Sequence, residues 1–226
     1  MKFEGSSKTT TFRLANVILF ARAILLASVT VLSFGGIIYV FDKYGPGSTV
    51  RPDMRFMSEL NRTLIYVHIF ASAVALMIGP LQFWTKLRLA NPKIHRWLGR
   101  AYLGGIVLGG STGLVLALQA KGGLTARLGF ACLAVLWLYT GARAYTTIRQ
   151  HKVQEHRRWM LRNFSLTFGA VILRVMLPTA LNNGIPFDVA YPAIAWLAWV
   201  PNLVVVEAAL WWQSKRSSTP GMSTDA

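Results

Sequence analysis

Six apolar stretches dominate this sequence, and each is long enough to cross a lipid bilayer. A spanning helix needs about 20 mostly apolar residues. The stretches cover residues 15–41, 62–84, 96–118, 127–148, 159–182 and 187–213. Their connections are too short to hold a soluble domain. We therefore predict an all-α fold, a polytopic membrane bundle of six transmembrane helices that forms a single domain over residues 1–226, with a flexible tail at 214–226.

The composition agrees with a multi-spanning membrane protein. The chain is 54% hydrophobic and 14% charged, with a mean hydropathy of +0.43, which is too apolar for an ordinary soluble domain. The single cysteine, Cys132, excludes an intrachain disulfide framework. The first stretch follows Lys2, Lys8 and Arg13, as a signal peptide would. It is too long for a signal peptide and has no clear cleavage site, so we interpret it as a spanning helix.

The basic residues lie mainly on one side of the predicted bundle. The net charge is +16. Of the 24 lysines and arginines, 16 lie at the two termini and in the loops after the second and fourth helices, and only 6 lie on the other side. The positive-inside rule therefore places both termini in the cytoplasm. This arrangement accounts for the charge without a nucleic-acid partner.

Two short segments at helix starts resemble each other. They are "PKIHRWLGR" at 92–100 and "QEHRRWMLR" at 154–162. Arginine and tryptophan at a helix mouth are explained as interface anchors, but the histidines are not. At about 100° per residue, His95 shares a helix face with Tyr102 and with a double GxxxG motif that permits close helix approach. We predict that His95 and His156 are neighbours at the cytoplasmic end.

The fifth helix carries a polar stripe. Counted from His156, the residues Asn163, Thr167 and Arg174 fall within roughly 20° of one face. Polar groups in a bilayer turn toward protein partners or a cavity, because the lipid tails offer no hydrogen-bond partners. Arg174 lies deep in the membrane, where an arginine indicates a functional site. The alternative is a structural ion pair or a contact with backbone carbonyls.

The second helix has a comparable face. His68 shares it with Gln82, and His68 and Arg174 reach similar depths when counted from opposite ends. The sequence therefore predicts a second pair, His68 and Arg174, in the outer half of the membrane. His151 falls in a loop and is expected to be solvated.

Two histidines on neighbouring helices suit a b-type haem. "HRWLG" also resembles the "H-x-W-L-G" segment of the two-haem transmembrane ascorbate cytochromes. That resemblance implies one haem held by His95 and His156, and it matches His68 to a ligand of a second haem. The fourth helix has no histidine, so a second bis-histidine haem is not predicted. A metal site is a weaker alternative, because the only carboxylate or thiolate near these histidines is Glu155.

A closer resemblance covers roughly residues 60–180. The segments "HIFASAVALMIGPLQF", "HRWLGRAY" and "HRRWMLRNFSLTFGAVILRVMLP" resemble a bacterial integral-membrane family known as domain of unknown function 2306. This resemblance implies a location in the bacterial cytoplasmic membrane. The matching positions are His68, Gly79, Pro80, Gln82, His95, Gly99, Arg100, Tyr102, His156, Trp159, Met160, Arg162, Arg174 and Pro178.

The sequence favours one function and leaves two others open. It has no GxSxG, HExxH or Walker motif. The leading hypothesis is a b-type-cytochrome-like haem protein, or a quinone-linked electron-transfer protein, with a quinone or redox partner in the bilayer. The first alternative is a non-redox bundle that binds or transports a small polar ligand or a lipid headgroup. The second is a structural membrane partner. The candidate cofactor ligands are His95, His156 and His68, and the candidate ligand-binding residues are Arg174, Asn163, Thr167, Gln82 and Tyr102.

Overall fold

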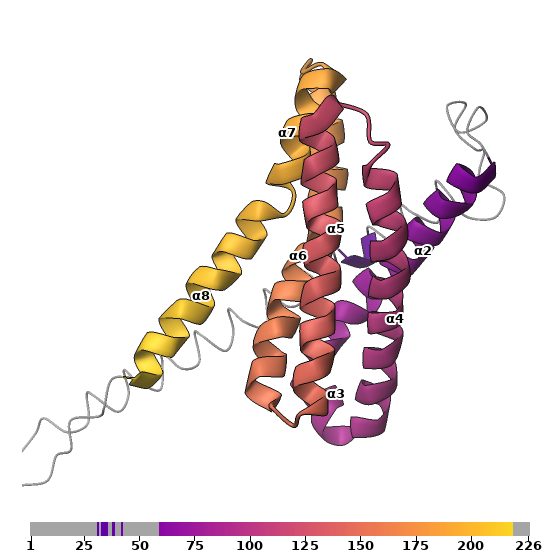
Figure 1. Ribbon diagram of the computed structural model, residues 1–226. Coiled ribbons are helices and arrows are strands. Elements are labelled where there is room, and N and C mark those ends of the chain that lie inside the picture. The colour runs from indigo at the N-terminus through magenta and orange to yellow at the C-terminus, as the bar shows by residue number, and fades with distance from the viewer. Residues whose placement is uncertain (1–30, 32, 36–37, 39–41, 43–58, 219–226) are drawn as a thin grey trace, which may run out of the picture.

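All regular secondary structure in the described part of the chain is α-helix. The computed structural model describes residues 31, 33–35, 38, 42 and 59–218, so most of the predicted first helix at 15–41 lies outside the described residues. The helices are α2 (Glu59–Gln82), α3 (Thr85–Ala90), α4 (Pro92–Ala117), α5 (Gly123–Arg149), α6 (Val153–Asn182), α7 (Phe187–Leu197) and α8 (Val200–Ser218) (Figure 1).

Five segments of the described chain are long and apolar enough to span a membrane. They are Asn61–Gln82, Pro92–Ala117, Gly123–Arg149, Val153–Asn182 and Phe187–Lys215. They coincide with the second to sixth predicted spans, although α4 and α6 begin four and six residues earlier than predicted. His95 and His156 therefore lie inside the first turns of their helices instead of just before them.

Two local features differ from the prediction. A short helix, α3, follows α2, where a loop was expected. The last predicted span, 187–213, is divided into α7 and α8. Pro201 explains the division, because it has no N–H to bond Leu197 and is tolerated only in the first turn of a helix. α8 therefore leaves the bundle at an angle to α7 (Figure 1).

Small residues let α4 lie close to α2. A Cβ added to Gly105 would stand 2.7 Å from the backbone oxygen of Ala71, and one added to Gly109 would stand 2.7 Å from Ser72 Oγ. These glycines belong to the predicted double GxxxG motif, and the close approach it implies is confirmed.

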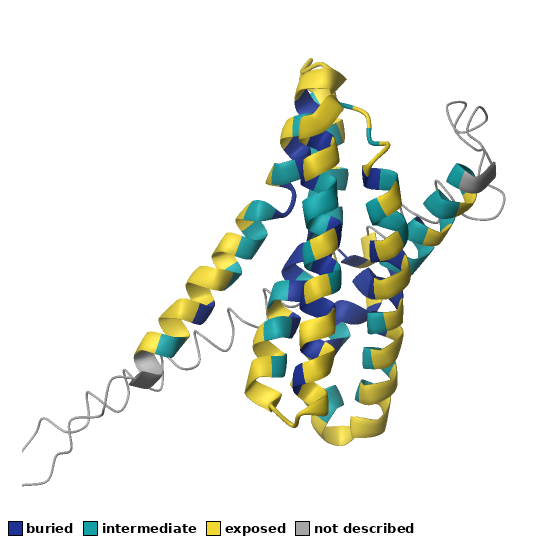
Figure 2. Cartoon of the chain, in the orientation of Figure 1, coloured by how far each residue is buried: buried dark blue, intermediate teal, exposed yellow. Residues whose placement is uncertain are grey.

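The interior and the outer surface of the bundle differ in the way expected of a membrane protein. Tyr102, Ile106 and Leu166 are almost fully buried, whereas Val107, Leu108 and other large apolar side chains are exposed. Figure 2 shows the buried residues on the inward faces of α4, α5 and α6 and the exposed ones outside. So much exposed apolar surface suits a chain surrounded by lipid.

Candidate functional site

A buried hydrogen-bond network joins α4, α5 and α6 at mid-height. The hydroxyl of Tyr102 donates to Asn163 Oδ1 at 2.7 Å and lies 3.0 Å from Thr167 Oγ1. Asn163 Nδ2 donates to the carbonyl oxygen of Trp137 and to Thr140 Oγ1, both at 2.8 Å. Trp137 Nε1 donates to Thr167 Oγ1 at 2.8 Å. The side chains of Asn163 and Thr167 thus face the interior, as the polar stripe predicted, and both bond the Tyr102 hydroxyl. Thr167 Oγ1 also donates to the backbone oxygen of Asn163 at 3.0 Å.

A cavity of about 650 Å³ lies between this network and the α4–α5 turn. Thr167 and Trp137 belong to both the network and the cavity wall. Most of the wall is apolar, and it comes from α2, α4, α5, α6 and α7. Its other polar side chains include His68, Ser72 and Arg174. The size and the few polar groups are typical of a small-molecule site.

The imidazole of His68 is held in a defined orientation. Its Nδ1 lies 2.8 Å from the backbone oxygen of Gly109. A carbonyl oxygen can only accept, so Nδ1 carries the proton and Nε2 is left as an acceptor in the neutral ring. Gly113 makes room for the ring, because an added Cβ there would be 2.8 Å from both His68 Cε1 and His68 Nδ1.

Arg174 contributes to the same cavity from α6. It is half-buried, and its NH1 donates to the backbone oxygen of Ala170 at 2.8 Å. Among the described residues that line the cavity, Arg174 is the one cationic side chain and none has a carboxylate. His68 and Arg174, which the sequence placed at similar depths, therefore line one cavity. Whether they bind a ligand there remains a prediction.

His95 and His156 lie together at the other end of the bundle. We call this end, made by residues 82–100 and 143–162, the basic end. His156 Nδ1 donates to the backbone oxygen of Ala144 at 2.8 Å. His95 is half-buried, and its Nδ1 is buried without a hydrogen-bond partner among the described residues. Both histidines lie in the first turns of their helices at this end of the bundle, and their sharing of one site stays a prediction.

Gln82 also belongs to the basic end. It is the last residue of α2, its side chain is buried, and its Nε2 has no hydrogen-bond partner among the described residues. His151 lies in the α5–α6 turn with a φ of 60° and is exposed, as expected.

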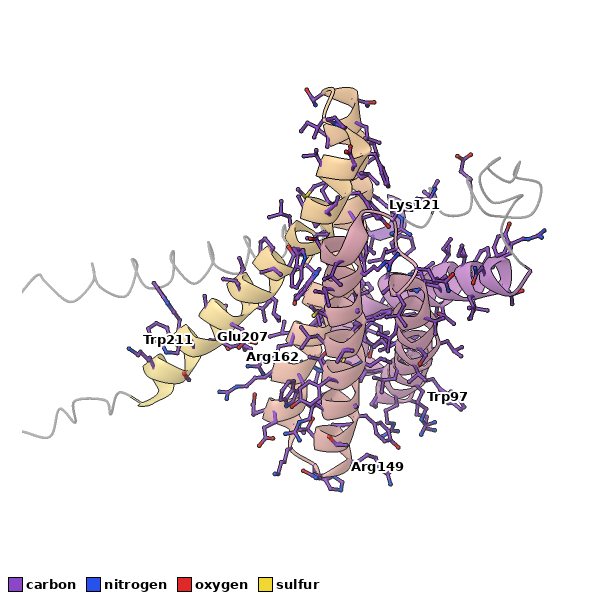
Figure 3. All side chains as sticks on the ribbon, turned by 45° about the horizontal axis from the view of Figure 1, so that its top comes forward. Trp97, Lys121, Arg149, Arg162, Glu207 and Trp211 are labelled. Atoms are coloured by element: carbon purple, nitrogen blue, oxygen red, sulfur yellow. The ribbon has the colours of Figure 1, made fainter. Side chains whose placement is uncertain are left out.

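An ion pair joins α6 to α8 near the basic end. Arg162 donates from Nε to Glu207 Oε1 at 2.5 Å and from NH2 to Oε2 at 2.9 Å. Arg162 also lies over the ring of Trp159, with Cζ 4.7 Å from the ring centroid. Figure 3 shows Arg162 and Glu207 pointing toward each other from α6 and α8. This bidentate pair accounts for a carboxylate within an apolar segment.

Sequence reasoning missed three contributors to the cavity. Gly113 entered the prediction only as part of the double GxxxG motif, and neither Ser72 nor Trp137 was singled out. The position of Trp137 was a usable signal, since most other tryptophans lie at helix ends. A mid-membrane indole needs a buried acceptor, which Thr167 provides.

Comparison with known families identifies the chain at the level of family. The family model described as "Predicted membrane protein (DUF2306)" matches residues 65–212, about two thirds of the sequence. The chain belongs to this family. The DUF2306 match includes the cavity and both pairs of candidate residues. No curated protein and no solved structure matches the chain. The comparisons show no relationship to the ascorbate cytochromes.

Proposed function

We propose that this DUF2306 protein binds a lipid-soluble molecule in the cavity at His68 and Arg174. The observation that carries the proposal is the cavity itself, about 650 Å³ with apolar walls and a few polar groups. The ligand would have an apolar body and an oxygen-bearing head. Quinones are the redox-linked members of this class, and fatty acids are non-redox members. The charge distribution supports a bacterial cytoplasmic membrane as its location.

The polar groups of the cavity suit an oxygen-bearing head. The Arg174 guanidinium offers donors to a carbonyl or carboxylate oxygen. The Ser72 hydroxyl, buried and without a partner among the described residues, offers another. His68 Nε2 is an acceptor, so it would bind the hydroxyl of a hydroquinone but not a quinone carbonyl. The cavity therefore has complementary groups for both redox forms.

Tryptophan fluorescence provides a test, because Trp137, one of eight tryptophans, lines the cavity. The purified full-length chain in phosphatidylcholine nanodiscs would be titrated with ubiquinone-1, ubiquinol-1 and decanoate. Quinone and fatty-acid binding should quench or shift the emission. His68→Phe should weaken ubiquinol-1 binding about tenfold, because one buried hydrogen bond is lost. His151→Phe is the matched control, since His151 is exposed. Equal affinity of wild type and His68→Phe for all three probes would contradict the proposal.

A b-type haem held by His95 and His156 is the second candidate function. The hydrogen bond from His156 Nδ1 to Ala144 leaves Nε2 available, which is the usual arrangement of a ligating histidine. His95 has an unpartnered ring nitrogen nearby. A bound haem would supply one-electron chemistry.

A reduced-minus-oxidised absorption spectrum of the purified protein tests this candidate. His95→Ala or His156→Ala should abolish any b-type bands, whereas His151→Ala should leave them unchanged. A spectrum without such bands removes the haem hypothesis.

A further inference from the structure

We infer that the basic end carries a second binding site, for a phosphate group, formed by Gln82, His95 and Arg88. This site lies at the end of the bundle opposite to the His68–Arg174 cavity and does not depend on the function proposed for that cavity.

The first observation is the Gln82 amide. The side chain is only 6% exposed, yet its Nε2 has no hydrogen-bond partner among the described residues. Its Oε1 lies against α4, where a Cβ added to Gly99 would be 3.4 Å away. A buried NH₂ group without an acceptor costs free energy, because it has lost its hydrogen bonds to water and has formed none within the protein. An acceptor is therefore missing at this point.

The second observation is the ring of His95. His95 lies one helical turn before Gly99 on α4, and residues four apart share a helix face. The Gln82 amide and the His95 ring therefore face the same region between α2 and α4. His95 Nδ1 is also buried without a partner among the described residues. Two nitrogen atoms from different helices thus lack hydrogen-bond partners in this region. The Gln82 amide nitrogen is a donor, and His95 Nδ1 is a donor when it carries the ring proton.

The charge around this place favours an anion. Arg88 of α3 is half-buried, and its positive charge repels a protonated His95 ring. The segment 82–100 has no carboxylate and contains Lys86, Arg88, Lys93, Arg96 and Arg100. Glu155, the one carboxylate in residues 143–162, is exposed. Nitrogen donors with an arginine and no competing carboxylate are the groups that bind phosphate oxygens.

The depth of the site matches that of a lipid headgroup. Trp84 and Trp97 flank it in sequence and are 51% and 68% exposed, and Arg100 lies over the Trp97 ring at 4.9 Å. Exposed tryptophans with basic neighbours mark the membrane–water interface. The phosphate of an anionic lipid is at this level, and free phosphate can reach it from the water.

Binding by the full-length chain in phosphatidylcholine nanodiscs tests the site. Inorganic phosphate is titrated by calorimetry, and short-chain phosphatidic acid is added and counted by native mass spectrometry. We expect wild type to bind at least one of them. Gln82→Leu should weaken binding about tenfold, because one charge-assisted hydrogen bond is lost, and Gln82→Glu should weaken it further through repulsion. Binding of phosphatidic acid alone assigns a headgroup site, and binding of inorganic phosphate assigns a site for the free anion.

Two controls separate a local effect from a folding defect. Gln119→Leu makes the same change at an exposed glutamine at the other end of the bundle and should not alter binding. Arg88→Gln should weaken binding, whereas Lys86→Gln, on the exposed side of the same short helix, should have a smaller effect. The proposal is overturned if wild type binds neither probe, or if Gln82→Glu and Arg88→Gln both bind as wild type does. Quinone titration of the same variants reports separately on the cavity.

Discussion

Asn163 has a hydrogen-bond partner for every polar atom of its side chain. Its amide nitrogen bonds two acceptors on α5, and its oxygen accepts from Tyr102. The residue is fully buried, so water cannot replace a bond that is removed. Saturation of this kind fixes the relative rotation of α4, α5 and α6, and thereby places Thr167 and Trp137 at the cavity wall.

Removing the Tyr102 hydroxyl should measurably destabilise the bundle. Tyr102→Phe removes the partner of Asn163 Oδ1 and a contact of Thr167 Oγ1. We expect a loss of about 1–2 kcal/mol in the free energy of unfolding, above the ~0.6 kcal/mol average of bilayer hydrogen bonds, because buried polar atoms lose partners. Titration with sodium dodecyl sulphate, followed by circular dichroism, measures it. Tyr145→Phe, on the exposed side of α5, is the control and should change stability by less than about 0.5 kcal/mol.

The inward direction of the polar side chains could be predicted from the sequence, but their partners could not. A spacing of 3.6 residues per turn places Asn163 and Thr167 on one face, and lipid forces that face inward. The partners depend on how α4 and α5 are rotated and shifted along their axes. For Gln82, helical spacing likewise indicated a face but could not indicate that its Nε2 would lack a partner.

At the scale of the helices, α4 is the element on which the others depend. Its glycines bring it against α2 and leave space for the His68 ring. A double GxxxG motif can be recognised in sequence, so this contact was predictable. The break between α7 and α8 was harder to predict from the sequence, because Pro201 is compatible with a kinked helix as well as with two helices. The short helix α3 carries no periodicity long enough to predict.

Replacement by alanine should have different effects on stability at two neighbouring glycines of α4. A Cβ at Gly105 would meet the Ala71 backbone oxygen at 2.7 Å, whereas one at Gly104 meets nothing within 4 Å. Gly105→Ala should therefore push α2 from α4 and cost about 1–3 kcal/mol. Gly104→Ala should be neutral, or stabilise by up to about 1 kcal/mol through helix propensity. Unfolding of both variants in detergent measures this difference in stability. Similar stabilities would mean that α2 and α4 are not in the contact described.

At the scale of the whole molecule, the two proposed sites lie toward opposite ends of the helix bundle. The basic end holds Gln82, His95 and His156, and the cavity with His68 and Arg174 lies toward the α4–α5 turn. Lys121, in the turn before α5, and Arg149, the last residue of α5, mark the two ends of the bundle in Figure 3. The buried network at Tyr102 lies between them. A ligand in the cavity and an anion at the basic end would therefore be taken from different sides of the bilayer.

The sidedness itself is a prediction from charge. Of the 24 basic residues, 16 belong to the basic end and the two termini, and 6 to the other side. Such an excess keeps a loop on the cytoplasmic side, because lysine and arginine resist translocation. We therefore expect both termini and the Gln82–His95–Arg88 site in the cytoplasm. An alkaline phosphatase fusion, which is active only after export, should be active at Ser48 and inactive at Gly221, with the reverse pattern for green fluorescent protein. Phosphatase activity at Gly221 but not at Ser48 would invert the topology and turn the phosphate site toward the outer leaflet.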